Sequence, residues 1–464
     1  MSTRMSTRMS TTSAPAPTQT HVFSFPHSRS VIFEEAVHTP YVFITTPSPD
    51  PVYVKIRLSD WSYSNATYIS STNHANFTLP MSAILGNSTG IYDRSVIVTS
   101  EADIMVYGMN SERTSADAFS VLEVDDLDLE YYVASYTPVL SDDPDRTTAY
   151  SEVSVSATGQ ETQVTLTNLE GDVLAEVTLQ DYETYQLLSE DDLTGVKITA
   201  TNPVSVMAGS NCAWIPFQQY EEIRYSGNCG YVMENLPGAN GFGNEFVLAP
   251  FEGRRLGYVY RVIASMDATS VTVSSSTYND SFTLNSQEFY EGNISSSEVL
   301  VIESDKPVLV AQYSKDRHTE VIYETDAGNP SMVIVTPTTE YKRAALIPVT
   351  TLSATRSQSN YINVIVNCDQ KDDVTIESLT MEYTSVDGRF CVLSGNVSAP
   401  ELYDLVIPPP GAFTVQVYGF ARYAAYSYQV PGYDPDTAAV TGNCLILSGI
   451  PFSVTAPWVE GKVG

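Results

Sequence analysis

The five cysteines are the side chains whose spacing makes the most definite chemical prediction. Cys212 and Cys229 enclose a segment with few strand signals, which a disulfide would close; two buried thiols are the alternative. Cys368 and Cys391 are predicted to form a second disulfide across adjacent strands of one repeat. Cys444 then has no partner within the chain and is expected to be buried, with a bond to another chain as the alternative. Because no Cys-x-x-Cys pair is present, neither a zinc site nor thioredoxin-like chemistry is indicated.

One short motif raises the question of catalysis. The segment Gly86-Asn-Ser-Thr-Gly90 matches the Gly-x-Ser-x-Gly pattern of serine hydrolases, which requires a strand before the serine and a helix after it. A strand-like run, Ser95–Val98, follows instead, and the five histidines suggest no catalytic triad. The sequence therefore predicts that the protein is not an enzyme.

The formal net charge of −32 indicates which partners to expect. Nucleic acid and anionic membrane surfaces are disfavoured because both would be repelled, whereas a cationic ligand, Ca²⁺ or a basic protein is compatible with this charge. Carboxylates cluster in turns and can supply the hard oxygen ligands that Ca²⁺ prefers, although ordinary surface turns also explain them and none forms an EF-hand loop. The candidate calcium ligands are Asp142, Asp143 and Asp145; no other cofactor is predicted. The other clusters are Asp125, Asp126 and Asp128; Glu190, Asp191 and Asp192; and Asp434 and Asp436.

Several features predict secretion. Six asparagines lie in Asn-x-Ser/Thr acceptor sequences for N-linked glycans: Asn65, Asn76, Asn87, Asn279, Asn293 and Asn396. Together with the cysteine pattern, they predict a secreted, extracellular glycoprotein. Residues 1–20 are rich in Ser, Thr, Pro and Ala, contain no visible signal-peptide core and are expected to form a disordered arm. No run of 18 or more apolar residues appears, so no membrane span is predicted.

A repeat organises the rest of the chain. Four β-branched segments, Val54–Leu58, Val164–Leu166, Val271–Val273 and Val374–Ile376, begin 110, 107 and 103 residues apart. Such a fixed period is typical of repeated supersecondary units, and 464 residues exceed what one core usually supports. The predicted domains are the arm (1–20), β repeat 1 (21–130), β repeat 2 with the Cys212/Cys229 loop (131–235), β repeat 3 (236–340), and β repeat 4 with a C-terminal strand tail (341–464).

The predicted fold class is all-β, with four tandem antiparallel repeats of roughly 100 residues each. Each repeat contains short strand-like runs separated by turns, and no window shows sustained helical periodicity. Sandwich-like units packed together would bury each sheet within its own repeat, whereas a propeller-like ring of blades would bury sheets between neighbouring repeats. The sandwich arrangement is preferred because each repeat is about twice as long as a four-stranded blade.

Three segments carry a resemblance to a known family. They are Pro203-Val-Ser-Val-Met-Ala-Gly-Ser-Asn-Cys212-Ala-Trp-Ile-Pro216, Cys229-Gly-Tyr-Val-Met-Glu-Asn-Leu-Pro237 and Gly243-Asn-Glu-Phe-Val-Leu-Ala-Pro250, and further matches follow in order at Tyr260–Ala264, Ser304–Tyr313, Asn329–Pro337 and Asn360–Val366. In order and cysteine spacing they resemble the N-terminal domain of IgGFc-binding proteins, over about Tyr131 to Tyr428. The resemblance implies a secreted protein of mucus or adhesive layers. The cysteine-dense von Willebrand type D modules of many members do not occur here, and the resemblance identifies no Fc-binding residues.

The predicted function is therefore a secreted, non-enzymatic binding or adhesion module of an extracellular or mucus-like layer, which recognises a glycoprotein or another copy of itself. The alternative is a structural subunit that assembles into an extracellular filament or sheath. In that case the N-terminal arm and Cys444 would join neighbouring copies. A rise in mass with concentration would favour the second function.

Overall fold

The computed structural model describes residues 19–28, 39–111, 115–139, 148–217, 229–294, 298–316, 328–352, 358–376, 379, 381–421 and 424–435. These residues form strands connected by turns and short 3-10 helices, and the strand ladders are antiparallel. The predicted all-β fold with antiparallel repeats is confirmed. Gln19 and Thr20, which the prediction placed in the disordered arm, belong to the first strand, so that boundary is wrong; residues 1–18 lie outside the described residues.

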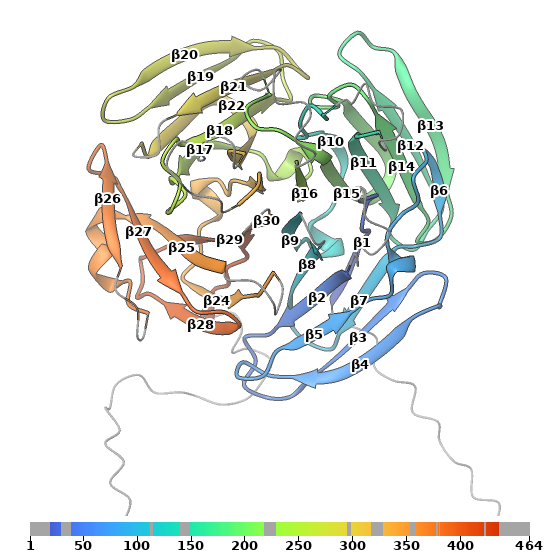
Figure 1. Cartoon of the computed structure of the whole chain (residues 1–464), viewed down its shortest axis with the longest axis horizontal. Coiled ribbons are helices and arrows are strands. Elements are labelled where there is room, and N and C mark those ends of the chain that lie inside the picture. Colours follow the sequence, from blue (N-terminus) through green and yellow to red (C-terminus); the bar gives the residue numbers. More distant parts are fainter. Residues whose placement is uncertain are drawn as a thin grey trace, which may run out of the picture.

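The strands form four units that follow one another around a central axis (Figure 1). Units 1 and 2 are joined by more than the chain connection, because β6 (Gly90–Tyr92) of unit 1 extends the sheet of unit 2 by pairing with β14 (Thr184–Ser189). Unit 1 contains β1 (Gln19–Phe23), β2 (Thr39–Thr45), β3 (Val52–Leu58), β4 (Ser64–Ile69), β5 (Ala75–Thr78), η1 (Met81–Ala83), β6 (Gly90–Tyr92), β7 (Val96–Ser100), β8 (Met105–Ser111) and β9 (Ala116–Val121). Unit 2 follows η2 (Val124–Asp126) and contains β10 (Asp128–Tyr132), β11 (Ser151–Ala157), β12 (Thr162–Thr167), β13 (Val173–Leu179), β14 (Thr184–Ser189), β15 (Lys197–Ala213) and β16 (Gly230–Leu236).

Units 3 and 4 complete the ring (Figure 1). Unit 3 follows η5 (Ala239–Gly241) and contains β17 (Gly243–Leu248), β18 (Tyr258–Ala264), β19 (Thr269–Ser274), β20 (Asn279–Leu284), β21 (Phe289–Ile294), β22 (Leu300–Ser314) and β23 (Met332–Ile334). Unit 4 follows η7 (Thr338–Glu340) and contains β24 (Ala344–Val349), β25 (Gln358–Asn367), η8 (Cys368–Asp373), β26 (Glu382–Val386), β27 (Phe390–Val397), β28 (Glu401–Val406), β29 (Phe413–Ala421) and β30 (Ala424–Val430).

In units 2 and 3, one long strand belongs to two layers. The first part of β15 pairs with β10 and β12, and its second part pairs with β11 and β16. In unit 3, β22 divides its partners in the same way between β17 and β19 on one side and β18 and β23 on the other. Units 1 and 4 replace the long strand with two shorter ones, β7 and β8 in unit 1 and β28 and β29 in unit 4. Each unit is therefore sandwich-like.

Two prolines mark the point where the long strands change partners. Pro203 lies between the residues of β15 that pair with β12, which end at Ala200, and those that pair with β11, which begin at Val204. Pro307 holds the same position in β22. Since these positions lie outside those two ladders, the missing proline N–H leaves both ladders intact. Each long strand therefore continues through its proline.

The segments that revealed the repeat are equivalent in three units. Val54, Val164 and Val271 lie in β3, β12 and β19, each of which pairs with the central strand of its unit. The fourth segment, Val374–Ile376, follows η8 and is not a strand, so that part of the prediction is wrong. Its two apolar side chains are still buried in the core of unit 4, which accounts for the repeated sequence pattern.

The apolar cores connect each unit to the next and close the ring. The core of unit 1 includes Met207 and Met233 of unit 2, and the core of unit 2 includes residues of unit 3. The core of unit 3 includes Phe420 of unit 4, and the core of unit 4 includes Phe43 and Tyr107 of unit 1. Sheets are thus buried both within a repeat and between repeats, so sandwich-like units are arranged in a ring.

Candidate functional site

Four inner strands surround the axis, one from each unit: β9, β16 and β30, which are labelled in Figure 1, and β23, which contacts β16 and β30. Each of them contacts its two neighbours around the ring, including β30 with β9, where the fourth unit meets the first. The Ser120 hydroxyl of β9 donates a hydrogen bond to the Gln429 carbonyl of β30 and helps to close the ring. These strands bring residues more than 300 positions apart in sequence into contact.

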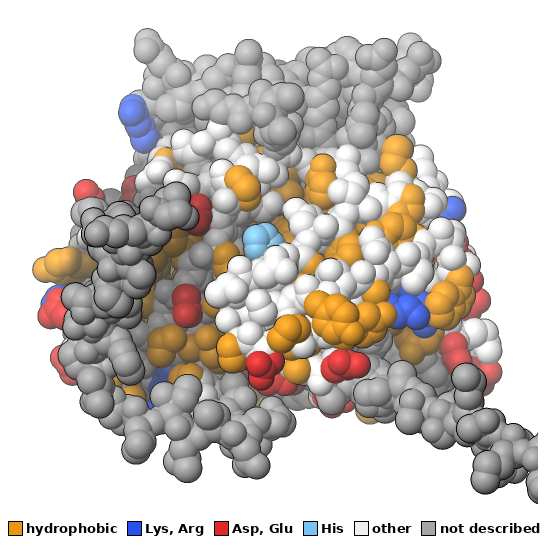
Figure 2. All heavy atoms as spheres, turned by 90° about the horizontal axis from the view of Figure 1, so that it is seen from below, with side chains coloured by type: hydrophobic (Ala, Val, Ile, Leu, Met, Phe, Trp, Pro, Cys, Tyr) orange, Lys and Arg blue, Asp and Glu red, His pale blue; other side chains and the backbone are white. Residues whose placement is uncertain are grey.

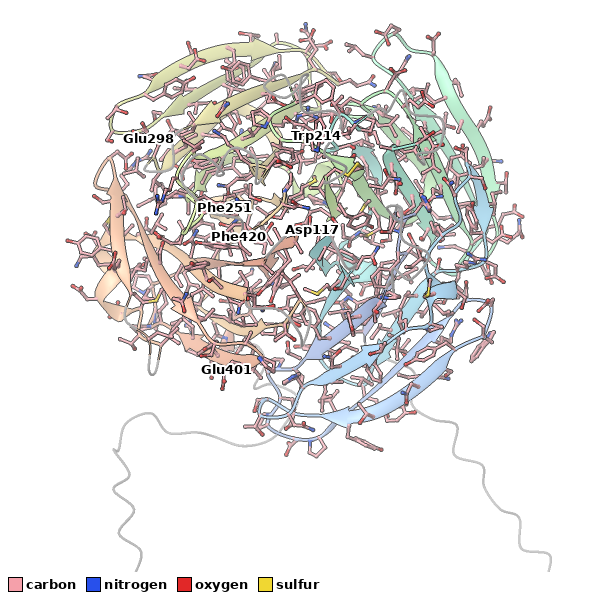
Figure 3. All side chains as sticks on the ribbon, in the orientation of Figure 1. Asp117, Trp214, Phe251, Glu298, Glu401 and Phe420 are labelled. Carbon is pink, nitrogen blue, oxygen red and sulfur yellow. A yellow bond between two sulfur atoms is a disulfide. The ribbon has the colours of Figure 1, made fainter. Side chains whose placement is uncertain are left out.

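Asp117 joins all four inner strands. Its carboxylate accepts hydrogen bonds from the backbone N–H of Met233 in β16 (3.2 Å), Met332 in β23 (3.0 Å) and Ser427 in β30 (3.1 Å), and from that of Ala118 (3.0 Å). The residue is fully buried and lies near the centre of the ring (Figure 3). Burial raises the pKa of Asp117 well above its usual range, and the four N–H donors act in the opposite direction.

The geometry around Asp117 favours the ionised carboxylate. All four described partners are donors, so a protonated carboxyl group would direct its own O–H toward an N–H rather than toward an acceptor. A buried carboxylate that accepts several backbone N–H bonds is stabilised by them. Because these bonds consume its lone pairs, Asp117 holds the ring together rather than binding a ligand.

A pocket of about 510 Å³ lies on the axis beyond Asp117. Every inner strand contributes to its lining, with Ser120 from β9, Glu234 from β16, Ile334 from β23 and Gln429 from β30. These residues follow Asp117 and its three partner residues by one to three positions in their strands. The pocket, called here the axial pocket, is therefore a product of the whole ring.

The connections between units form the rim of the axial pocket. Asp125 and Asp126 come from η2, Asn240 and Gly241 come from η5, and Glu340 comes from η7. The walls are apolar and combine side chains from units 3 and 4: Phe246, Val308, Leu309, Val335, Phe413, Val415 and Val430. The pocket thus has an acidic rim around an apolar interior.

Carboxylates outnumber cations among the residues that line the axial pocket. Asp125, Asp126, Glu234 and Glu340 face a single lysine, Lys342, among the lining residues, and the ammonium of Lys342 lies 3.9 Å from the carboxylate of Asp434. Burial, followed by the charges of Asp125 and Glu340, raises the pKa of Asp126, while Lys342 opposes this shift. The carboxylates repel one another, so a bound cation would relieve that repulsion.

Glu234 is the most deeply placed of these carboxylates. Its side chain is 4% exposed, and its Oε1 atom has no hydrogen-bond partner among the described residues. Burial, followed by the charge of Asp117, raises the pKa of Glu234 well above its usual range, while backbone hydrogen bonds from Ile334 and Asn235 to this carboxylate oppose the shift. A buried carboxylate oxygen without a donor is costly, so a donor supplied by a ligand would be favourable here.

This arrangement fits a cationic group carried on an apolar stem. The side chains of lysine and arginine have this form, with a charged head and a stem of methylene groups. In the described parts of the chain, no group of three or more His, Cys, Asp or Glu side chains is placed to hold a metal ion.

Both predicted disulfides are confirmed. Cys212 at the end of β15 bonds to Cys229 just before β16, with 5.0 Å between their Cα atoms. Trp214 packs against this pair in a small core near the axis (Figure 3). Cys368 of η8 bonds to Cys391 of β27, with 4.8 Å between Cα atoms. Cys444 lies outside the described residues.

The other predicted residues have different outcomes. Asp142, Asp143 and Asp145 lie outside the described residues, so calcium binding there stays a prediction. All six acceptor asparagines (Asn65, Asn76, Asn87, Asn279, Asn293 and Asn396) are exposed, and their glycosylation also stays a prediction. The Gly86–Gly90 motif leads into the strand β6 rather than into a helix, and the Ser88 hydroxyl contacts the Tyr92 hydroxyl at 2.8 Å.

The axial pocket was not predicted from the sequence. In the sequence, Asp125 and Asp126 were noted only as acidic residues in a turn. No sequence pattern marked Glu234 or Glu340 as a candidate site residue. Asp125 and Asp126 lie in η2, Glu234 lies in β16 and Glu340 lies in η7, so only the closure of the ring brings these four carboxylates together. Asp117 carried one available signal, because it is a charged residue within a strand of small and apolar residues.

Comparison with known proteins places this architecture in a family. The family model described as IgGFc binding protein matches residues 117–419, more than half of the chain. The chain belongs to the IgGFc-binding protein family. The match includes Asp117 and all four carboxylates of the axial pocket, so the family region contains most of the candidate site.

The match to an individual relative covers less of this chain than the family model does. The human protein named "IgGFc-binding protein" is 29% identical over 195 residues, which is 39% of this chain and 3% of that protein. This chain therefore spans only a small part of that relative's length. A solved structure titled "Biofilm associated protein - BSP domain" covers 93% of this chain and 99% of its own, at 8% identity and a TM-score of 0.12, which is too low to support any argument. No helix in the described ranges is long and apolar enough to cross a membrane.

Proposed function

We propose that this chain is an extracellular, non-enzymatic binding module whose axial pocket holds a lysine or arginine side chain of a protein ligand. The observation that carries the proposal is the buried Glu234 oxygen without a described hydrogen-bond partner, in a pocket whose rim has Asp125, Asp126 and Glu340. An ammonium or guanidinium group would donate to that oxygen and neutralise the rim. The apolar walls would cover the aliphatic stem.

Three features support an extracellular location. The two disulfides are typical of proteins that fold in oxidising compartments. The six exposed acceptor asparagines are accessible to N-linked glycosylation. Membership of the IgGFc-binding protein family also agrees with an extracellular binding role.

The ligand we propose is an extracellular protein or glycoprotein that presents a basic side chain, and a second copy of this chain is one such case. The name of the human relative refers to the Fc part of IgG, so Fc belongs among the first proteins to test. Assembly into a filament or sheath remains the alternative function. Cys444 and residues 1–18, which would join the copies, lie outside the described residues.

Binding of short peptides tests the axial pocket directly. Capped pentapeptides with a central lysine or arginine between leucines are titrated into the full chain by calorimetry, alongside the same peptide with norleucine at the centre. The cationic peptides should bind, and the affinity should fall by roughly tenfold in Glu234→Gln and in the double variant Asp126→Asn/Glu340→Gln. Glu382→Gln, which removes an exposed carboxylate of β26 outside the pocket lining, should bind as the unaltered chain does.

The pH dependence provides a second criterion. Because the pKa values of Asp126 and Glu234 are raised, protons compete with a cation for these carboxylates as the pH falls, and binding should weaken on acidification from about pH 7.5 to about pH 5. Equal binding of the norleucine peptide, or unchanged affinity in both carboxylate variants, would refute a cation site. Light scattering across a concentration series tests whether the ligand is a second copy of this chain. Self-association is supported if the mass of the unaltered chain rises with concentration while the Glu234→Gln variant keeps the mass of a monomer.

A further inference from the structure

The outer face of unit 1 carries an aromatic and cationic surface on β3 and β4. In β3, Val54 and Ile56 point into the core, while Tyr53, Lys55 and Arg57 alternate with them and are partly exposed. The residues opposite them on β4 are Tyr68, Ala66 and Ser64, all of them exposed. β4 pairs only with β3 in its sheet, so its outer side is an edge.

This face carries exposed aromatic rings. Trp61, in the turn between the two strands, is 62% exposed, and Tyr68 is 60% exposed. The rings of Tyr53 and Tyr68 contact each other with 5.3 Å between centroids. In Figure 2, which looks at the ring from the side of unit 1, hydrophobic side chains lie beside a small group of Lys and Arg side chains. We call Tyr53, Lys55, Arg57, Trp61 and Tyr68 the unit-1 face.

The two cations of the unit-1 face lie against its rings. The guanidinium of Arg57 is 4.4 Å from the Trp61 ring and 5.1 Å from the ring of Tyr182 in unit 2, and the ammonium of Lys55 is 5.2 Å from Trp61. Stacking on both rings restricts the guanidinium plane and leaves its edge available for hydrogen bonds. One of its nitrogens, Nη1, donates a hydrogen bond of 3.3 Å to the Leu58 carbonyl, which further restricts the group.

No described carboxylate neutralises these cations. The chain carries a net charge of −32, with 55 acidic and 23 basic residues, so partners for a cation are plentiful. Arg261 and Arg389, for comparison, each pair with two or more carboxylates. Neither Lys55 nor Arg57 lies within ion-pair distance of a carboxylate in the described ranges. The unit-1 face is thus suited to an anion.

The fold itself does not require this composition. In the equivalent strand of unit 2, the three outward positions are Gln163, Thr165 and Thr167, and in unit 3 they are Ser270, Thr272 and Ser274. Both strands keep the buried valines and pair with their central strands in the same way. Since short neutral side chains serve the same sheet equally well, the tyrosine, lysine and arginine of unit 1 have another role.

We propose that the unit-1 face binds a sialylated oligosaccharide. The C–H side of a sugar ring would stack on the exposed ring of Trp61 or Tyr68, because aromatic faces carry partial negative charge and C–H groups carry partial positive charge. The carboxylate of the sialic acid would accept paired hydrogen bonds from the edge of Arg57, with Lys55 as a second cation. This site is separate from the axial pocket and goes beyond the function proposed for it.

The test uses the full chain with its own N-linked glycans removed enzymatically, because Asn65 lies on β4 and a glycan there could compete. Binding of a 3′-sialylated and a 6′-sialylated lactose, of lactose itself, of a sulfated lactose and of a tetra-aspartate peptide is measured by saturation-transfer NMR and titration. The sialylated sugars should bind and lactose should not. Trp61→Asn and Arg57→Gln should each weaken binding roughly tenfold or more.

The substitutions are chosen so that folding does not confuse the result. Trp61 has a positive φ of 59°, which asparagine tolerates better than most residues, so Trp61→Asn removes the ring without adding backbone strain. The matched control is Tyr383→Ala: Tyr383 is 63% exposed and lies 5.7 Å from Lys371, but Lys371 is already paired with Asp372. This variant should bind as the unaltered chain does.

Several results would overturn the proposal. They are equal binding of lactose and sialylated lactose, unchanged affinity in Trp61→Asn and Arg57→Gln, tighter binding of the sulfated sugar or the aspartate peptide, and no binding of any sugar. Glu234→Gln, which alters the axial pocket, should leave sugar binding intact. The two proposals can therefore fail independently.

Discussion

Replacing Asp117 by asparagine tests whether one carboxylate holds the four units together. The amide has nearly the same shape, so the change removes hydrogen-bond capacity without opening a cavity. One carboxylate oxygen accepts from Ala118 and Ser427 and the other accepts from Met233 and Met332. In the variant one of these oxygens becomes an NH₂ group, which faces two buried N–H donors that it cannot accept from.

The expected loss follows from that count. Leaving one buried donor unsatisfied costs about 1–3 kcal/mol, so two of them destabilise the ring by roughly 2–6 kcal/mol. The total free energy of unfolding of a protein is roughly 5–15 kcal/mol, so this loss is large. Urea unfolding followed by tryptophan fluorescence measures it, and Trp214, which is 3% exposed near the axis, is a suitable reporter.

A matched control removes a carboxylate of the same kind at the surface. Asp60 accepts hydrogen bonds from the backbone and side chain of Ser62 in an exposed turn, and Asp60→Asn should change the unfolding free energy by less than about 0.5 kcal/mol. If Asp117→Asn also costs less than about 1 kcal/mol, Asp117 is protonated in the folded chain or its N–H partners find other acceptors. Either result would refute the ionised carboxylate as the link between the units.

Three further predictions concern other contacts. Arg261 is buried and pairs with Asp192 of the neighbouring unit at 2.8 Å, so Arg261→Ala should destabilise the chain by roughly 3–5 kcal/mol in urea unfolding, and a loss below about 1 kcal/mol would contradict it. Replacing Cys212 and Cys229 by serine should lower stability by about 3 kcal/mol, and peptide mapping without reductant should show the bond in the unaltered chain. Burial lowers the pKa of His21 from 6.5 to about 4, so on acidification the His21 imidazole of the unfolded chain is protonated before that of the folded chain. The free energy of unfolding should therefore fall as the pH drops from 6.5 to about 4, and His21→Gln should make it depend less on pH over this range.

The sequence was most informative where a pattern is local or strictly periodic. The alternation of Val54 and Ile56 with polar residues predicts β3, and the same alternation predicts β12 and β19, because a half-buried strand needs it. Cysteine spacing led to both disulfides, since each pair lies within one unit at the ends of neighbouring elements. The fourth repeat was harder because the apolar residues of Val374–Ile376 pack into the core without joining a ladder.

The arrangement of the units and the axial pocket depend on contacts that sequence patterns do not encode. Ser427 meets Asp117 across 310 positions, and this contact exists only after the ring has closed. Within its own strand, Asp117 is a single charged residue among small and apolar ones, and Glu234 is a polar residue in a strand that is buried on both faces. Neither strand alone shows what these carboxylates contact. Their roles follow from the N–H groups and carboxylates that the other units bring to them.

The two proposed binding sites both occur where equivalent repeat positions differ. Inward-facing positions such as Val54, Val164 and Val271 are fixed by the need to fill a core in every unit. Axial and outward positions carry no such requirement: the inner strands bring Ser120, Glu234, Ile334 and Gln429 to one pocket, and Lys55 of unit 1 corresponds to threonine in units 2 and 3. Divergence at those positions costs the fold little, because their side chains lie outside the shared cores. A ring of similar units can therefore acquire different ligand chemistries on its axis and on each outer face without changing its architecture.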